Sequence, residues 1–170
     1  MYDRFGEFDS AEEINKKAAE MIEAGDIEGI YALAAENGIE KEDAAEYLNG
    51  RENELTSPLM AAFGKLKVES EHLKISGELS VWMDIVKGIC MEDMRMCEAV
   101  RKKGKSMKIC MAALIKYSFE NKVQVSDQIV DEVKVEQVND GKIVPMRKPL
   151  YMSGMDRVQA RRIITDYYTK

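Results

Sequence analysis

The sequence predicts a mainly α-helical protein, built from a small acidic module of three helices followed by a larger helical bundle. Three observations predict this fold. Apolar residues recur at helical spacing along most of the chain, capping residues precede these stretches, and glycines end several of them. A chain of 170 residues that is 45% hydrophobic can form one ordinary domain or two small ones. We therefore expect residues 1–55 to form the acidic module and residues 56–170 to form the bundle.

Three short helices are expected in the acidic module. Ser10 caps the first helix in a capping box with Glu13, and Gly25 ends it. The other two helices cover residues 26–37 and 41–48. Apolar residues at helical spacing supply their buried faces. These residues are Ile14, Ala18, Met21 and Ile22 in the first helix and Ile27, Ile30, Tyr31 and Ala34 in the second.

The second and third of these helices have the rhythm of a helix-turn-helix, with Gly38 at the turn. The candidate recognition helix, however, carries Glu40, Glu42, Asp43 and Glu46 against a single lysine. DNA phosphates would repel these carboxylates, because neutralisation of phosphate charge dominates DNA binding. The sequence therefore favours a packing arrangement at this position over a DNA-reading one.

Four more helices are expected between residues 58 and 121. Ser57 caps the first of them, with Pro58 in its first turn, and Ser106 caps the last. The two in between begin near residues 79 and 92. The helix after Ser106 should lie at the centre of the bundle core, because its face is almost wholly apolar. That face consists of Met107, Cys110, Met111, Leu114, Ile115 and Phe119.

Residues 123–145 are compatible with two structures. A helix could begin at Ser126-Asp127, whereas the valines that follow suit a strand pair around the Asn-Asp-Gly turn at 139–141. We expect a short helix and then an irregular segment or a hairpin near 133–146. A final helix covers residues 155–168, and its Tyr and Met side chains would permit a homodimer.

Charge is unevenly spread along the chain. The formal net charge is −6, but residues 1–57 carry 16 acidic against 5 basic residues. Residues 95–122 carry 8 basic against 2 acidic, and residues 142–170 carry 7 basic against 2 acidic. One end of such a molecule could meet a basic protein surface and the other phosphates or an acidic surface. The alternative is that these charges only solvate helix faces.

Five basic residues lie close together around one predicted turn. Backbone N–H groups beside Ser106, where a helix begins, add to their positive field and favour an anion site. Two arginines of the last helix would enlarge this site into a phosphate or acidic-protein footprint if they fold nearby. The residues are Arg101, Lys102, Lys103, Lys105 and Lys108, with Arg161 and Arg162 from the last helix.

The residues that carry chemistry are few. The chain has one histidine, His72, and three cysteines without CxxC spacing, so we expect no metal site. It has neither GxGxxG nor GxxxxGK[ST], so no phosphate loop and no cofactor are expected. We therefore expect no catalytic residues and a protein that is not an enzyme. The absence of an 18-residue apolar run and of an export signal predicts no membrane span and a cytoplasmic location.

The segment around the basic turn resembles the core of the PcfK-like proteins. That core has an acidic helix, then a Val-x-x-x-Gly-Lys-Ser turn, then a helix, and residues 92–110 follow this order with Val100 and Gly104 in the turn. The closing residues from Val158 to Tyr168 resemble the terminal helix of the family. The resemblance covers about residues 80–122 and 155–168. PcfK-like proteins occur on conjugative elements and phages of Firmicutes, and some members or relatives are type II-A anti-CRISPR proteins that inhibit Cas9.

The resemblance implies a non-enzymatic mobile-element protein that binds Cas9, or the Cas9–guide RNA complex, in the host bacterial cell. Cas9 holds nucleic acid in a positively charged channel. The carboxylates of Glu40, Glu42, Asp43 and Glu46 could occupy such a surface as phosphate mimics, whereas the basic turn could contact guide RNA or DNA. Two alternatives remain open: a nucleic-acid-binding accessory protein of conjugation or phage replication, and a helical scaffold for another host protein.

Overall fold

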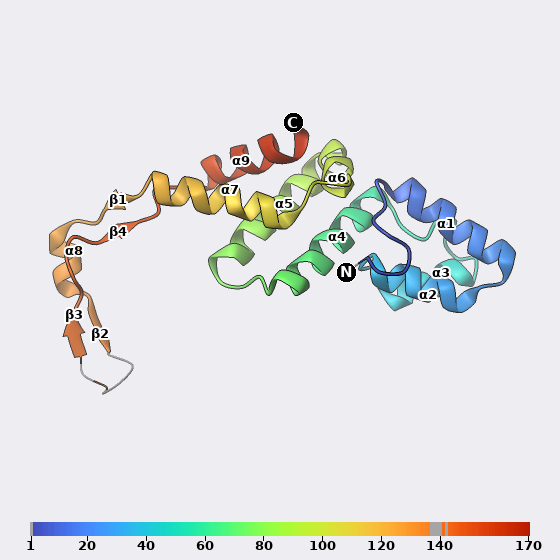
Figure 1. The fold of residues 1–170 in the computed structure, drawn as a ribbon, viewed down its shortest axis with the longest axis horizontal. Helices are drawn as coiled ribbons and strands as arrows, with labels where there is room; N and C mark the ends of the chain where they lie inside the picture. The colour runs from blue at the N-terminus through green and yellow to red at the C-terminus, as the bar shows by residue number, and fades with distance from the viewer. Residues whose placement is uncertain (1, 137–140, 142) are drawn as a thin grey trace.

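The structure, a computed structural model, describes residues 2–136, 141 and 143–170 and confirms the mainly α-helical prediction. An acidic module at one end leads into an elongated helical body, and an arm that consists of the described residues 122–136, 141 and 143–155 projects from the other end (Figure 1). The module contains α1 (Ala11–Ala24), α2 (Ile27–Glu36) and α3 (Lys41–Leu48). The body contains α4 (Pro58–Leu73), α5 (Glu78–Glu92), α6 (Met94–Arg101), α7 (Met107–Glu120) and α9 (Arg157–Thr169). The arm contains β1 (Val123–Gln124), α8 (Asp127–Glu132), β2 (Lys134–Glu136), β3 (Ile143–Pro145) and β4 (Tyr151–Met152).

The caps predicted for the acidic module are present. The Ser10 hydroxyl accepts a hydrogen bond from the Glu13 N–H, and Gly25 ends α1 with a φ of 69°. The core of the module gathers side chains from all three helices, and Ala61 of α4 completes it. Ile22 and Ile27 were expected on buried faces but are exposed, because they flank the α1–α2 turn at the free end of the module.

Two glycines bring the module directly against the body. Gly38, in the α2–α3 turn, has a φ of 69°, and a Cβ atom there would lie 2.3 Å from the carbonyl oxygen of Gly64 in α4. A Cβ atom on Gly64 would lie 2.1 Å from the carbonyl oxygen of Asn37. Only a side chain of hydrogen allows this approach. The helix-turn-helix therefore packs its turn onto α4.

The body packs five helices around a second core. Leu66 of α4, Trp82 of α5, Met107 of α7 and Ile164 of α9 are among its buried side chains. Only the first part of α7 contributes as expected. Phe119 is 75% exposed and Ile115 is also exposed, so their prediction as core residues was wrong. The last turns of α7 extend beyond the other body helices toward the arm, which leaves both side chains uncovered (Figure 1).

The arm is an antiparallel extension of the chain between α7 and α9. β1 pairs with β4 at its base, with Val123 opposite Met152. β2 pairs with β3 further out, with Val135 opposite Val144, which confirms the hairpin expected near 133–146. α8 lies between the two strand pairs, as the helix prediction from Ser126-Asp127 required. Asn139 and Asp140 of the expected turn lie outside the described residues.

Candidate partner-binding surfaces

The acidic residues of α3 are placed by the way this helix packs. Ala44 and Tyr47 are buried against the module core, so the opposite side of α3 faces outward. Glu42 and Glu46 are exposed and one helical turn apart, and Asp43 is half-buried. None of these three carboxylates forms an ion pair with another described residue. They therefore keep their negative charge available to a partner.

Glu40 has a different role. Its carboxylate lies 2.6 Å from the ammonium group of Lys67 on α4, and the hydrogen bond between them raises the pKa of Lys67. Both side chains are largely exposed, so the pair adds little to stability. It does fix the beginning of α3 beside α4, next to the turn that packs on Gly64.

A groove of about 330 Å³ lies between the start of α3 and α4. Leu59, Met60 and Phe63 give this α3–α4 groove an apolar lining. Glu40 and Asp43 line it from α3, and Lys67 and Lys87 line it from the body. The apolar lining suits the aliphatic stem of a lysine or arginine. Asp43 is the carboxylate of this groove that is not paired with a lysine, because Glu40 pairs with Lys67.

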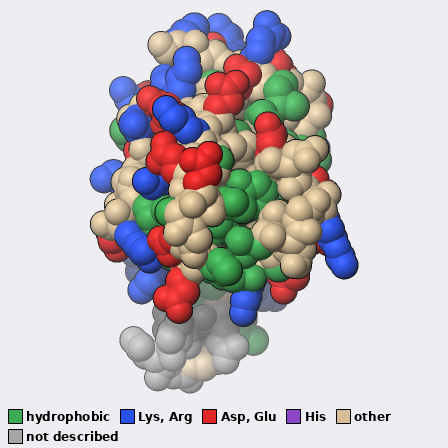
Figure 2. Space-filling view, turned by 90° about the vertical axis from the view of Figure 1, so that its right-hand side faces the viewer, with side chains coloured by type: hydrophobic (Ala, Val, Ile, Leu, Met, Phe, Trp, Pro, Cys, Tyr) green, Lys and Arg blue, Asp and Glu red, His purple; other side chains and the backbone are tan. Residues whose placement is uncertain are grey.

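Figure 2 views the molecule from the end that carries the acidic module. Acidic and basic side chains alternate there around an exposed hydrophobic patch. Ile22 and Ile27 are the large apolar side chains that the module exposes within the described residues. The negative charge of the module is thus distributed around apolar surface and does not form one unbroken acidic face.

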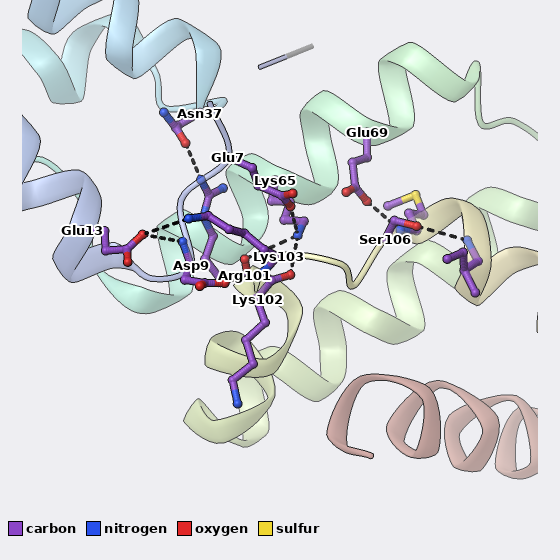
Figure 3. Close-up of polar contacts among 12 residues, drawn as sticks. Glu7, Asp9, Glu13, Asn37, Lys65, Glu69, Arg101, Lys102, Lys103 and Ser106 are labelled. Carbon is purple, nitrogen blue, oxygen red and sulfur yellow. Dashed lines mark hydrogen bonds and ion pairs between the residues drawn. The ribbon is translucent and has the colours of Figure 1, made fainter. Parts of the chain in front are cut away.

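Arg101 is not a surface residue. Its side chain is 1% exposed, and its guanidinium donates a hydrogen bond to the Asn37 side-chain oxygen (Figure 3). The guanidinium also lies 5.9 Å from the centre of the Tyr2 ring. Burial lowers the pKa of Arg101 and raises that of Tyr2 to about 12. The expectation that Arg101 contacts a partner was therefore wrong, because this arginine joins α6 to the module.

Two of the predicted basic residues are engaged within the molecule. The backbone N–H of Lys103 donates to the Asp9 carboxylate at 2.6 Å, and its ammonium group lies 3.9 Å from Glu13. The ammonium group of Lys105 donates to the Tyr167 carbonyl at 2.7 Å and lies 5.1 Å from the centre of that ring. These lysines hold the turn before α7 to α1 and α9.

The anion site expected at the start of α7 is already filled. The Met107 N–H donates to the Glu69 carboxylate at 2.6 Å, and the Ser106 N–H donates to the Tyr167 hydroxyl at 2.7 Å (Figure 3 draws the first). The Ser106 hydroxyl accepts from the Ile109 N–H. Burial raises the pKa of Glu69, while the Met107 N–H and the ammonium of Lys65 act in the opposite direction. A side chain of the protein thus takes the place of the expected ligand.

The remaining basic residues do not gather into one patch. Lys102 lines a cavity with Asp9 and Glu98, whereas Lys108 lines a separate one with Glu69 and His72. Arg161 forms an ion pair with Glu92 of α5, and Arg162 is exposed on α9. Of the footprint expected from the sequence, Arg101 is buried, and Lys103, Lys105 and Arg161 are engaged by groups of the protein itself.

Sequence reasoning missed a buried lysine at the junction between module and body. Lys65 is 1% exposed, and its ammonium group donates to the Glu7 carboxylate and to the Lys102 carbonyl at 2.9 Å (Figure 3). A signal was present, because Lys65 shares its helix face with Ala61, Ala62, Leu66 and Glu69. A lysine in the middle of an apolar face requires a buried partner.

The buried cysteines and the metal-binding residue types add no further site. Cys90, Cys97 and Cys110 are free thiols, and burial raises the pKa of Cys90 and of Cys110 to about 12. Across the described part of the chain, no three His, Cys, Asp or Glu side chains converge so as to hold a metal ion. Within the same residues, no helix is long and apolar enough to span a membrane.

Comparison with known proteins gives no match. No protein-family model, no curated protein and no solved structure is similar to this chain.

Proposed function

We propose that this chain is a non-enzymatic mobile-element protein that binds Cas9, or its guide RNA complex, and interferes with DNA loading or cleavage. The observation that carries the proposal is the set of unpaired carboxylates on α3 beside the α3–α4 groove. Glu42 and Glu46 offer exposed negative charge, and the groove offers an apolar cleft with Glu40 and Asp43 along one side.

Charge complementarity supports a cationic partner. Carboxylates that are exposed and unpaired in the free protein lose only part of their hydration on meeting a basic surface, and they steer that surface into contact. The groove would add specificity, because Met60 and Phe63 offer apolar surface to the stem of a lysine or arginine, and the unpaired carboxylate of Asp43 lies beside them, although Lys67 and Lys87 also line the groove. A protein that binds nucleic acid in a positively charged groove presents rows of lysine and arginine side chains there.

The resemblance to the PcfK-like proteins supports Cas9 as that partner. It rests on residues 80–122 and 155–168, which form α5 to α7 and most of α9 in the body. The acidic module lies outside it. In this proposal the body supplies a scaffold of the kind found on mobile elements, and the module supplies the surface that contacts the positively charged channel of Cas9.

The acidic end is the better candidate for the contact than the basic turn. Of the basic residues in that turn, Arg101 is buried, and Lys103 and Lys105 are held by groups of the protein itself. A contact to guide RNA or DNA through this turn would need those interactions to break first. The carboxylates of Glu42 and Glu46 require no such rearrangement.

The test is a titration of the purified protein into a Cas9–guide cleavage reaction, with a Cas9 from a matching host. The proposal predicts a dose-dependent loss of cleavage that is strongest when the protein is added before the target DNA. Protection that is equal before and after DNA addition would place the block at cleavage and not at loading. Unchanged cleavage at every dose would contradict the proposal and favour an accessory role in nucleic-acid binding, which a gel-shift titration measures.

A further inference from the structure

A groove between the beginnings of α5 and α9 is a second candidate site on the molecule. Its volume is about 250 Å³, and all the residues that line it belong to α5 or to the segment 155–160. We propose that this α5–α9 groove binds an arginine side chain in a peptide segment of a partner protein. The inference does not depend on the proposed function, because the groove shares no residue with α3 or α4.

Trp82 gives the groove an aromatic ring and an unused hydrogen-bond donor. Its side chain is 7% exposed, and Ile85 and Ala160, which line the groove with it, are also buried. The indole N–H donates to no group within the described part of the chain. Nor is its nitrogen one of the fully enclosed side-chain atoms that lack a partner there, so it is open to the groove that the ring lines. Buried indole N–H groups usually find an acceptor, so this donor indicates a ligand that brings one.

The groove has an excess of negative charge. Glu78, Asp84 and Asp156 line it against one basic residue, Arg157, and all four side chains are exposed. None of the four forms an ion pair with another described residue. The charges of Asp84 and Arg157 balance each other, so the excess comes from Glu78 and Asp156. An excess of negative charge disfavours an anion as the ligand and favours a cation.

Glu78 and Asp156 each lie at the beginning of a helix. Glu78 is the first residue of α5, and Asp156 caps α9, where its Oδ1 accepts from the Gln159 N–H at 2.8 Å. Its Oδ2 and both carboxylate oxygens of Glu78 have no partner among the described residues. Helix dipoles stabilise carboxylates at such positions, but they do not account for a groove between them. A guanidinium in this groove has donors for both carboxylates, because it carries five N–H groups in a planar fork.

The size of the groove favours a single long side chain as the occupant. Small-molecule pockets usually enclose about 300–1,000 Å³, and this groove is smaller. The aliphatic stem of an arginine can pack against Ile85 and Met155, and its guanidinium can lie against the ring of Trp82. A peptide also brings backbone carbonyl groups, which can accept from the indole N–H. A free amine or guanidine has no such acceptor, so the chemistry of the groove favours a peptide.

The first test uses the single tryptophan of the chain, whose indole N–H resonance reports on this groove alone. The probe is N-acetyl-L-argininamide, which carries the guanidinium, the stem and the carbonyl acceptors of a peptide. Titration followed by ¹H–¹⁵N NMR should shift this resonance with a dissociation constant on the order of 1 mM. N-acetyl-L-citrullinamide, which is neutral and of nearly the same shape, should leave it in place. No shift with the arginine probe, or equal shifts with both, would overturn the proposal.

Propylguanidine distinguishes a peptide from a free guanidine as the occupant. It keeps the cation and the stem of the arginine probe but has no carbonyl group. It should bind at least about 3-fold more weakly, because the indole N–H then gains no acceptor. Propylguanidine that binds as tightly as the arginine probe would overturn the assignment of a peptide.

A pair of double variants tests the two carboxylates. Glu78→Gln with Asp156→Asn removes both charges and keeps a residue that caps α9. Glu23→Gln with Glu28→Gln, at exposed positions of the acidic module, changes the net charge equally. The first variant should bind the arginine probe at least about 5-fold more weakly, and the second should bind it as the wild type does. Equal affinities of the two variants would overturn the proposal. The backbone amide resonances check that each variant is folded.

Discussion

At the scale of single residues, the junction between module and body depends on buried cations. Lys65 and Arg101 lie under the segment before α1, where Glu7 and Tyr2 meet them. A buried charge costs several kcal/mol unless it is paired and hydrogen-bonded, so these cations fix which segments can cover them. Two nitrogens of Arg101, Nε and Nη1, have no partner among the described residues, so this arginine contributes less to stability than Lys65 does.

Lys65 and Lys67, both on α4, allow the contribution of the buried cation to stability to be measured with a matched control. Lys65→Met removes a buried pair with Glu7 and the hydrogen bond to Lys102, and it should lower the free energy of unfolding by about 3 kcal/mol. Lys67→Met removes the exposed pair with Glu40 and should cost no more than about 1 kcal/mol. Urea denaturation of both variants gives the difference. Equal losses would show that the buried lysine is not what holds the junction.

The raised pKa of Glu69 predicts how the stability of the protein depends on pH. Burial raises its pKa in the folded protein above the ordinary value of 4.5, so the folded state binds the proton more tightly than the unfolded state. Stability contributed by this group is therefore present below pH 4.5 and declines as pH rises through the raised pKa. Glu69→Gln keeps an acceptor for the Met107 N–H and cannot ionise.

The comparison is made by urea denaturation at a series of pH values. Relative to Glu69→Gln, the wild type should lose stability as pH rises above 4.5. Glu71→Gln, at an exposed position of the same helix, serves as the control. A difference between wild type and Glu69→Gln that is constant with pH would be incompatible with a buried, titrating carboxyl group.

At the scale of elements, local signals in the sequence predicted most helices and their ends. Ser10, Ser57 and Ser106 cap the helices that they were expected to cap. Long-range contacts carried no such signal. β1 and β4 are two residues each and are separated by 26 positions in the sequence, so no local pattern predicts their pairing. The apolar face of α7 predicted burial for Phe119, but how far a helix extends past its neighbours is not encoded in its own residues.

The candidate site was predictable to a similar degree. The outward position of Glu42 and Glu46 follows from the helical spacing of Ala44 and Tyr47. The groove beside them does not, because it arises where α3 meets α4. Arg101 was expected on the surface because it belongs to a run of basic residues, and its contacts with the distant residues Asn37 and Tyr2 distinguish it from Lys102.

The contact between the α2–α3 turn and α4, which Gly64 allows, could not be predicted from the sequence either. A glycine in the middle of α4 lowers helix propensity, and the sequence gives no reason for it. In the structure it allows the α2–α3 turn to touch α4. Gly64→Ala should lower the free energy of unfolding by about 1–3 kcal/mol, because the added methyl group meets the Asn37 carbonyl.

Gly88 of α5 provides the control for this substitution. It also lies inside a helix, and a Cβ atom there would have no neighbour within 4 Å. Gly88→Ala should raise the stability by about 0.5–1 kcal/mol, as expected from helix propensity alone. Thermal unfolding of the two variants should therefore shift in opposite directions. A shift in the same direction would mean that the α2–α3 turn does not approach α4 as closely as the structure shows.

At the scale of the whole molecule, the two surfaces lie at opposite ends of a helical body. The acidic module presents negative charge, and the arm presents apolar side chains with balanced charge.

Replacing the arm tests whether it is a separable unit. Val123 and Met152 are opposite each other, so an Asn-Gly turn in place of residues 124–151 can close the chain. The helical body should keep its melting temperature within a few degrees, because its described core takes no residue from the replaced segment. Loss of cooperative unfolding would show that the arm is required for the fold of the body.

In the proposed function, the carboxylates of α3 bind a cationic surface of Cas9. The most direct measurement is the affinity of Cas9–guide complex for wild type, for Glu42→Lys with Glu46→Lys, and for Glu71→Lys with Asp84→Lys, at increasing salt. All four positions are exposed, and both double variants change the net charge equally. We predict that the α3 variant loses at least 10-fold in affinity and much of its salt dependence, while the control binds as the wild type does. Equal affinities for the three proteins would contradict the account.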